Sequence, residues 1–166
     1  MLIATMNPCP CGYYGAKEKK CNCKSDEIRK YIGKLSGPLW DRIDIQVEVN
    51  SVKYNNLENN KNIEKSETIR LRVNKARNKQ YERYKKYSIY SNSELTPKLI
   101  EKFCQLNNEG KQIMERAFEN LGLSARAYGR ILKVARTIAD LDDSENILAN
   151  HLTEAIQYRS LDRNKH

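Results

Sequence analysis

The chain has 166 residues, of which 39% are hydrophobic, enough for the core of one ordinary domain or two small ones. Lysine and arginine number 30 against 21 acidic residues, so the formal net charge is +9. This excess favours polyanionic partners such as nucleic acid or nucleotides, with a solvated basic surface as the alternative. No apolar run reaches the length of a signal peptide or a membrane span, so we expect a cytoplasmic protein with no membrane partner.

Two short apolar segments among the first fifty residues are predicted to be strands. Residues 2–5 form an apolar run stopped by Asn-Pro, which is typical of a buried strand. Residues 43–49 alternate apolar and polar side chains, the period of a strand with one buried face. Between them, Ser25 is expected to cap a short amphipathic helix that Gly37-Pro38 ends. The predicted order is strand, cysteine loop, helix, strand.

The rest of the chain is predicted to be helical after a linker. Residues 51–65 are rich in Asn and Lys and lack apolar periodicity, so we place a linker and a domain boundary there. A long basic helix follows over residues 66–87, and its basic side chains, interleaved with tyrosines, either face solvent or contact a phosphate backbone. Capping and turn signals divide the remainder into four helices, beginning at Thr96-Pro97, near Gly110, at Ser124 and at Asn150. A small helical bundle results.

Four of the five cysteines form two Cys-x-Cys pairs separated by nine residues: Cys9, Cys11, Cys21 and Cys23. In a reducing compartment, clustered cysteines more often bind metal than form disulfides. Four thiolates suit zinc and leave no open coordination position, so we predict a structural zinc site, with an iron–sulfur cluster or a redox thiol pair as alternatives. The lysine-rich loop between the pairs cannot build a core, so metal would organise it. Cys104 stands apart and is expected to be a buried small hydrophobe.

Two arginine settings differ from the general basic background. Arg42 lies just before the second predicted strand, and its simplest interpretation is an ion pair with Asp41 or Asp44. In the helix after Ser124, the expected buried seam consists of Ala127, Ile131, Val134, Ile138 and Leu141. Steps of about 100° per residue place Arg126, Arg130 and Lys133 within about 60° of one another, outside this seam, as a cationic stripe. A guanidinium aimed at a nucleotide's terminal phosphates neutralises charge in phosphoryl transfer, although exposed helical arginines are also common without such a role.

Several stretches of the chain together resemble one known family: LIATMNPCPCGYYG, the closing CNC, SGPLWDRIDIQVEV, LSARAYGRILKVARTIADL and HLTEAIQYRSLDR. In this order they resemble the C-terminal part of the ComM type of magnesium-chelatase-like AAA+ ATPases. The resemblance covers nearly the whole chain apart from residues 51–65. It implies the end of an AAA+ α/β core with a zinc-binding insertion over residues 1–50, followed by a helical lid over residues 66–166.

The resemblance also implies roles for individual residues. Asn7 matches the sensor-1 asparagine, which polarises the water that attacks the γ-phosphate, and Arg42 matches the arginine finger that reaches the neighbouring subunit's nucleotide. Arg126 matches the sensor-2 arginine, with Arg130 as a second candidate for contacting the nucleotide. The paired cysteines match the family's zinc-binding insertion. Because a finger that acts on a neighbour requires a ring, the family implies a homo-hexamer.

The motifs that would hold the nucleotide's phosphates and magnesium do not occur in this sequence. There is no G-x-x-x-x-G-K-[ST] pattern and no predicted strand that ends in paired acids. We therefore expect a C-terminal fragment that alone neither binds ATP tightly nor hydrolyses it, with ATP and Mg²⁺ as cofactors of the full-length protein.

The function implied for the full-length hexamer is ATP hydrolysis coupled to DNA remodelling, a helicase-like branch migration during recombination of incoming DNA. One alternative is a stand-alone zinc-dependent nucleic-acid-binding module that uses the basic helix and needs no nucleotide. Another is a chelatase-type subunit that drives metal insertion into a tetrapyrrole, although the cysteine insertion argues against it.

Overall fold

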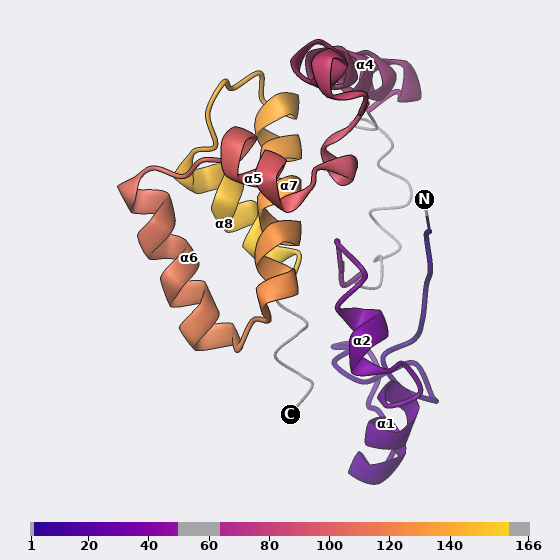
Figure 1. The fold of residues 1–166 in the computed structure, drawn as a ribbon. Coiled ribbons are helices and arrows are strands. Elements are labelled where there is room, and N and C mark those ends of the chain that lie inside the picture. Colours follow the sequence, from indigo (N-terminus) through magenta and orange to yellow (C-terminus); the bar gives the residue numbers. More distant parts are fainter. Residues whose placement is uncertain (1, 50–63, 160–166) are drawn as a thin grey trace. The chain divides into compact units, whose positions relative to one another are not determined.

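The structure is a computed structural model that describes residues 2–49 and 64–159 (Figure 1). The chain divides into two compact units. Among the described residues, the first unit contains residues 2–42 and 48–49. The second unit contains Ile43–Val47 and the described residues from 64 onward, with all the later helices. Most of the predicted linker, residues 51–63, lies outside the described residues. In the two described ranges, no helix has the length and apolarity needed to span a bilayer.

Two short helices form the regular part of the first unit. Helix α1 (Ser25–Ile32) carries acidic residues in its first turn and basic residues in its last turn, as the helix dipole favours. It ends at Gly33, and α2 (Gly37–Trp40) follows with Pro38 in its first turn. The predicted helix is therefore confirmed, but its expected end at the Gly-Pro pair is wrong. That proline begins the next helix, where its missing N–H would be unpaired in any case.

Neither predicted strand forms in the residues that the structure describes. Residues 2–5 and 43–49 have no regular secondary structure there, and Ile3 and Val47 are 78% and 62% exposed. In the second segment, the backbone N–H of Gln46 instead donates to the carbonyl of Tyr158 at 2.9 Å. The prediction of two buried strands is wrong for this structure. An alternating pattern specifies one apolar face, but a strand also needs a hydrogen-bonded neighbour.

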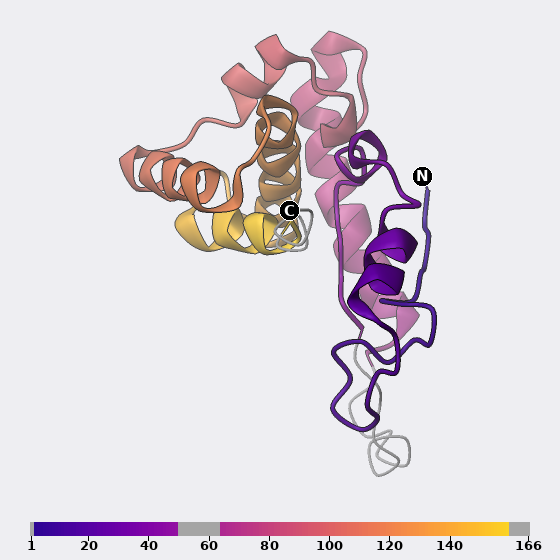
Figure 2. The same ribbon diagram turned by 90° about the horizontal axis from the view of Figure 1, so that it is seen from below.

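The second unit is a helical bundle built around one central helix. Its elements are α4 (Ser66–Tyr84), α5 (Pro97–Phe103), α6 (Asn108–Leu121), α7 (Ala125–Leu141) and α8 (Ala149–Gln157), with 3-10 turns at Lys85–Tyr87 and Asn92–Glu94. Helix α7 packs against α4, α5 and α8, and Figure 2 shows α4 and α7 side by side. The predicted helices of the second half are confirmed, with boundaries displaced by about three residues at most.

Local signals set the boundary between α6 and α7. Gly122 adopts a left-handed conformation with φ of 59°, which ends α6 at little steric cost. Two residues later, the hydroxyl of Ser124 accepts a hydrogen bond from the N–H of Ala127 at 3.2 Å and caps α7. At the other end of α6, the side chain of Asn107 accepts from the N–H of Gly110 at 2.8 Å. These contacts involve near neighbours only. The sequence predicts the stop at Gly122 and the cap at Ser124, whereas the cap at Asn107 was not predicted.

The buried face of α7 differs from the predicted seam. Ala127 and Ile131 are buried as expected, whereas Leu141 is 38% exposed. The core cluster includes Cys104, as predicted, and consists of Tyr84, Leu95, Cys104, Met114, Ile131, Leu132, Ala135, Ala139, Ile147, Leu152 and Ala155. Charged residues of α7 also enter the interior, namely Arg136 and Asp140. An apolar pattern cannot identify this face, because oppositely charged side chains that pair inside the fold look like surface residues in the sequence.

Asp140 is the centre of a buried polar network that joins α4, α7 and the second 3-10 turn. Its carboxylate accepts hydrogen bonds from Arg83 at 2.5 and 3.0 Å and from Arg136 at 3.2 Å. The amide of Asn92 donates to the same carboxylate at 2.9 Å and accepts from the hydroxyl of Tyr84 at 2.6 Å. Arg83 thus belongs to the interior network rather than to a solvated face of the basic helix.

A second ion-pair cluster links α4 to the loop after α7. The Lys75 ammonium lies 2.7 Å from the Asp143 carboxylate, which also pairs with Lys79. These hydrogen bonds, that of Lys75 first, lower the pKa of Asp143 from 3.8 to about 2. Because this pKa is lower in the folded state, the pairs contribute stability above pH 4 that is lost as the pH falls toward 2.

We therefore expect the urea midpoint to fall between pH 4 and pH 2 by less in Asp143→Asn than in the unmodified chain. Asparagine tolerates the positive φ of 61° at this position, so the substitution removes charge without backbone strain. Asp26→Asn, at an exposed ion pair within α1, is the matched control and should keep the full pH dependence. Identical pH profiles for Asp143→Asn and the unmodified chain would contradict the assignment.

Candidate functional site

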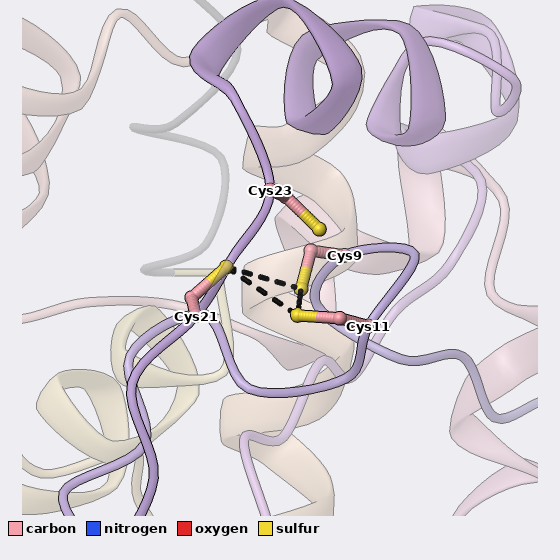
Figure 3. Close-up of side chains that lie close together, drawn as sticks. All are labelled: Cys9, Cys11, Cys21 and Cys23. Carbon is pink, nitrogen blue, oxygen red and sulfur yellow. Dashed lines mark hydrogen bonds between the residues drawn. The ribbon is translucent and has the colours of Figure 1, made fainter.

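The four paired cysteines meet at one point in the first unit. Figure 3 shows their thiols converging from the two ends of the intervening loop. The Sγ atom of Cys11 lies 3.4 Å from that of Cys9 and 3.5 Å from that of Cys21, and all four sulfurs, including that of Cys23, lie within 4.8 Å of one another. All are free thiols, and Cys9 is fully buried. The predicted cysteine cluster is therefore formed.

A tight turn brings the first pair of thiols to the same side. The N–H of Gly12 donates to the carbonyl of Cys9 at 3.0 Å, and Gly12 has φ of 82°. Only glycine adopts this conformation freely, so a side chain at position 12 would open the turn that holds Cys9 and Cys11 together. The Cys-x-Cys spacing and the adjacent glycine together therefore place the two thiols on the same side of the turn.

Backbone N–H groups surround the sulfurs. They donate from Tyr14 to Cys9, from Tyr13 and Asn22 to Cys11, from Cys23 to Cys21, and from Cys11 to Cys23. The two bonds to Cys11 lower its pKa to about 6, so this thiol is ionised at neutral pH. Cys23 behaves differently. The backbone hydrogen bond from Cys11 lowers the pKa of Cys23, but burial and the neighbouring thiols outweigh this effect and raise the pKa to about 12. A second thiolate beside that of Cys11 is therefore disfavoured unless a positive charge lies among the sulfurs.

This arrangement fits a single metal ion. A tetrahedral zinc with Zn–S bonds of about 2.3 Å places its sulfurs about 3.8 Å apart, close to the 3.4–3.7 Å found between neighbouring thiols here. An iron–sulfur cluster brings its own iron and sulfide atoms and needs a wider spacing of ligands. The four thiols can therefore hold one metal ion and are compatible with structural zinc, which would crosslink the two ends of the loop.

Asn7 and Arg42 both lie in the first unit, and both are exposed. The side chain of Asn7 lies beside the cysteine turn, 3.8 Å from where a Cβ at Gly12 would be. Arg42 follows α2, and its backbone N–H donates to the carbonyl of Leu39 at 3.0 Å. The structure thus places Asn7 against the cysteine turn and Arg42 at the exit of a short helix, and their proposed chemistry remains a prediction.

The predicted cationic stripe of α7 lies in the second unit and divides into three environments. Arg126 is exposed in the first turn of the helix. Arg130 forms an ion pair with Asp44, and Lys133 donates to the carbonyl of Ser93 at 2.8 Å. Asp44 was one of the two partners considered for Arg42. The structure therefore brings Arg130 to a carboxylate, and it leaves Arg126 as the more exposed of the two candidate nucleotide-contacting arginines.

Sequence reasoning missed the contacts that attach Ile43–Val47 to the helical unit. The guanidinium of Arg159 is buried and donates to the carbonyl of Ile43 at 2.6 Å. These two residues are 116 positions apart, and no pattern in the sequence links them. The buried Arg83–Asp140 contact was missed for the same reason, since its partners are 57 positions apart.

Comparison with known proteins identifies the family. Residues 63–159 match the family model described as magnesium chelatase, subunit ChlI C-terminal, and residues 1–57 match the model described as magnesium chelatase, subunit ChlI. The chain belongs to the magnesium chelatase ChlI family. The helical second unit corresponds to the C-terminal model of that family, and the cysteine cluster lies within the region of the other model.

Relatives specify the type within the ChlI family. The chain is 42% identical over 163 residues to competence protein ComM of Haemophilus influenzae and 39% identical over 165 residues to uncharacterized protein YifB of Escherichia coli. Each match covers 98% of this chain and 31% of the relative, so the chain spans about a third of their length. The resemblance to the ComM type is confirmed. This is a ComM/YifB-type magnesium-chelatase-like protein of the AAA+-like ATPase family.

Proposed function

We propose that this ChlI-family chain is the sensor, finger and lid portion of a ring-shaped ATPase motor that remodels DNA. The observation that carries the proposal is the relationship to ComM and YifB, which extends over 98% of the chain. In the full-length homo-hexamer, ATP hydrolysis drives branch migration during recombination of incoming DNA. The name of the Haemophilus influenzae relative, competence protein ComM, supports this choice.

The proposal assigns a role to each candidate residue. Asn7 polarises the water that attacks the γ-phosphate, and Arg42 neutralises charge on the nucleotide of the neighbouring subunit. Arg126, with Arg130 as the second candidate, contacts the nucleotide within its own subunit. Zinc at the four cysteines supplies a structural crosslink. Because Asn7 lies two residues before the first of these cysteines, the crosslink holds the amide in a constant position.

DNA-stimulated ATP hydrolysis tests the motor proposal. The rate is compared for this chain, for a version extended upstream to the length of its relatives, and for the extended version with Arg42→Ala. We expect turnover only in the extended protein, and a loss of at least about 100-fold in kcat for Arg42→Ala, because an arginine finger stabilises charge in the transition state. Arg29→Ala, which removes another exposed arginine of the same unit, is the matched control and should keep full activity.

Two results would contradict the proposal. If the extension adds no activity, or if Arg42→Ala leaves the rate unchanged, the chain is not part of a motor of this design. Salt-sensitive DNA binding that needs neither nucleotide nor extension would then favour the stand-alone zinc-dependent binding module.

A further inference from the structure

Two exposed tyrosines of the second unit form a stacked pair. The rings of Tyr81, near the end of α4, and Tyr90, just before the second 3-10 turn, are nearly parallel, with an interplanar angle of 13° and centroids 6.3 Å apart. They are 51% and 59% exposed. Large aromatic rings with about half their surface in water are unusual for a structural contact, because burial is what normally makes such rings stabilising.

The pair is held in place by the fold beneath it. Tyr81 is preceded by Gln80 and followed three residues later by Tyr84, and both of these neighbours are buried in α4. On the other side, Ile89 packs against the core cluster, and the N–H of Tyr90 donates to the carboxylate of Glu94 at 3.3 Å. The backbone positions of both rings are therefore set before any ligand arrives, which lowers the entropy cost of binding.

The structure separates the basic residues of α4 and the turn after it into two groups. Five of them pair with carboxylates, namely Arg72 with Glu64, Lys75 and Lys79 with Asp143, Arg83 with Asp140, and Lys85 with Glu82. The other three are Arg70, Arg77 and Lys86, which are exposed and form no ion pair within the part of the chain that the structure describes. These three cations are the ones available to an external anion.

Two of the three available cations share the face of α4 that carries Tyr81. At about 100° per residue, Arg70, Arg77 and Tyr81 fall within about 40° of one another on α4, and a rise of about 1.5 Å per residue separates Arg77 from Tyr81 by about 6 Å along the axis. Lys86 follows five residues after Tyr81. The carboxylate of Glu82 lies close by but is already paired with Lys85 at 2.5 Å. The surface therefore combines stackable rings with a net positive charge.

We propose that the Tyr81–Tyr90 pair, with Arg70, Arg77 and Lys86, binds single-stranded nucleic acid. Bases stack on the exposed tyrosine faces and the cations contact the phosphates, which is how single strands are bound without sequence preference. A duplex offers no free base faces along its length, so the rings select the single strand. The inference deepens the proposed function and rests on it for the choice of DNA rather than RNA as the natural ligand.

Fluorescence anisotropy with a labelled oligo-dT, in the absence of nucleotide, tests the role of the rings. Tyr81→Leu should weaken binding by about 5- to 100-fold because it removes a stacking surface, and Tyr81→Phe should restore it to within about twofold. Since Tyr81 is half exposed, neither change should disturb folding, and circular dichroism checks this. Equal affinities of Tyr81→Leu and the unmodified chain would overturn the inference, as would tighter binding of a duplex of the same length.

A charge-matched pair of variants tests the cations. Each phosphate contact on a single strand contributes about 0.7 to the slope of log affinity against log salt. The double variant Arg70→Gln with Arg77→Gln removes two such contacts and should therefore reduce the magnitude of the slope by about 1.4. Lys111→Gln with Arg116→Gln removes two exposed charges from α6 and should leave the slope unchanged. If both double variants lowered the salt slope equally, the effect would come from net charge alone, and the assigned binding surface would be overturned.

The ligand and the motor are tested separately. Tighter binding of oligo-dT than of oligo-rU supports DNA, and the reverse order would overturn that choice. Tyr81-dependent binding combined with no ATP hydrolysis in the extended protein would overturn the motor proposal alone. ATP hydrolysis in the extended protein, combined with binding that does not depend on Tyr81, would overturn this inference alone.

Discussion

Replacing Cys9 and Cys21 by serine together should abolish zinc binding and loosen the loop between the two cysteine pairs. The unmodified chain should carry about one zinc ion, because its four thiols converge within 4.8 Å, whereas a serine hydroxyl does not replace a thiolate as a zinc ligand. The intervening loop is exposed and rich in lysine, so metal binding provides the free energy that apolar burial would otherwise supply. Metal analysis gives the zinc content, and hydrogen exchange over residues 9–23 reports the loosening.

Cys104 provides the matched control for the zinc prediction. It lies 3% exposed in the core of the other unit and takes no part in the cluster, so Cys104→Ala should retain all of the zinc. It removes a thiol and thereby separates the effect of the site from that of the cysteine count. A zinc-free unmodified protein prepared from zinc-containing medium, or unchanged exchange in the double serine variant, would contradict the prediction.

Asp140→Ala should destabilise the helical unit by about 3–5 kcal/mol, as expected when one partner of a buried ion pair is removed. The carboxylate is fully buried and is shared by Arg83 and Arg136, whose side chains are 20% and 3% exposed. Without it, two poorly hydrated guanidinium groups face each other, and the amide of Asn92 loses one of its acceptors. Urea unfolding monitored by circular dichroism measures the loss.

Two further variants sharpen the test of Asp140. Asp140→Asn keeps an oxygen acceptor but not the charge, and should lose less stability than the alanine variant. Asp143→Asn also removes an acidic charge that pairs with lysines of α4, but at an exposed site, so its effect at neutral pH should be far smaller. If Asp140→Ala and Asp143→Asn proved equally stable, the buried network would not have the importance assigned to it.

Much of the helical architecture and the cysteine cluster could be predicted because their signals are local. Ser124 caps α7, Gly122 ends α6, and Pro97 begins α5, and each acts through contacts with residues a few positions away. The Cys-x-Cys pairs likewise place their thiols through short turns. Local patterns of this kind determine the local backbone geometry without long-range contacts, and only the exact boundaries depend on neighbouring elements.

The candidate nucleotide residues show a different limit. Motif resemblance marked Asn7, Arg42, Arg126 and Arg130, but the motifs carry no information about what each side chain contacts. Only the fold reveals that Arg130 pairs with Asp44 from 86 positions away. The alternating residues 43–49 are a related case, because a strand depends on a partner that the pattern itself does not contain.

The sequence alone thus determined the helices, the cysteine cluster, the basic character and the family. The tertiary structure decided which basic side chains pair with carboxylates of the protein itself and which can contact an external anion. Lys75, Lys79 and Arg83 look equivalent to Arg70 and Arg77 in the sequence, yet the first three meet carboxylates from beyond α7 or within it. The physical reason is that ion pairing and ring stacking depend on distances in space, and folding brings together residues that the sequence keeps far apart.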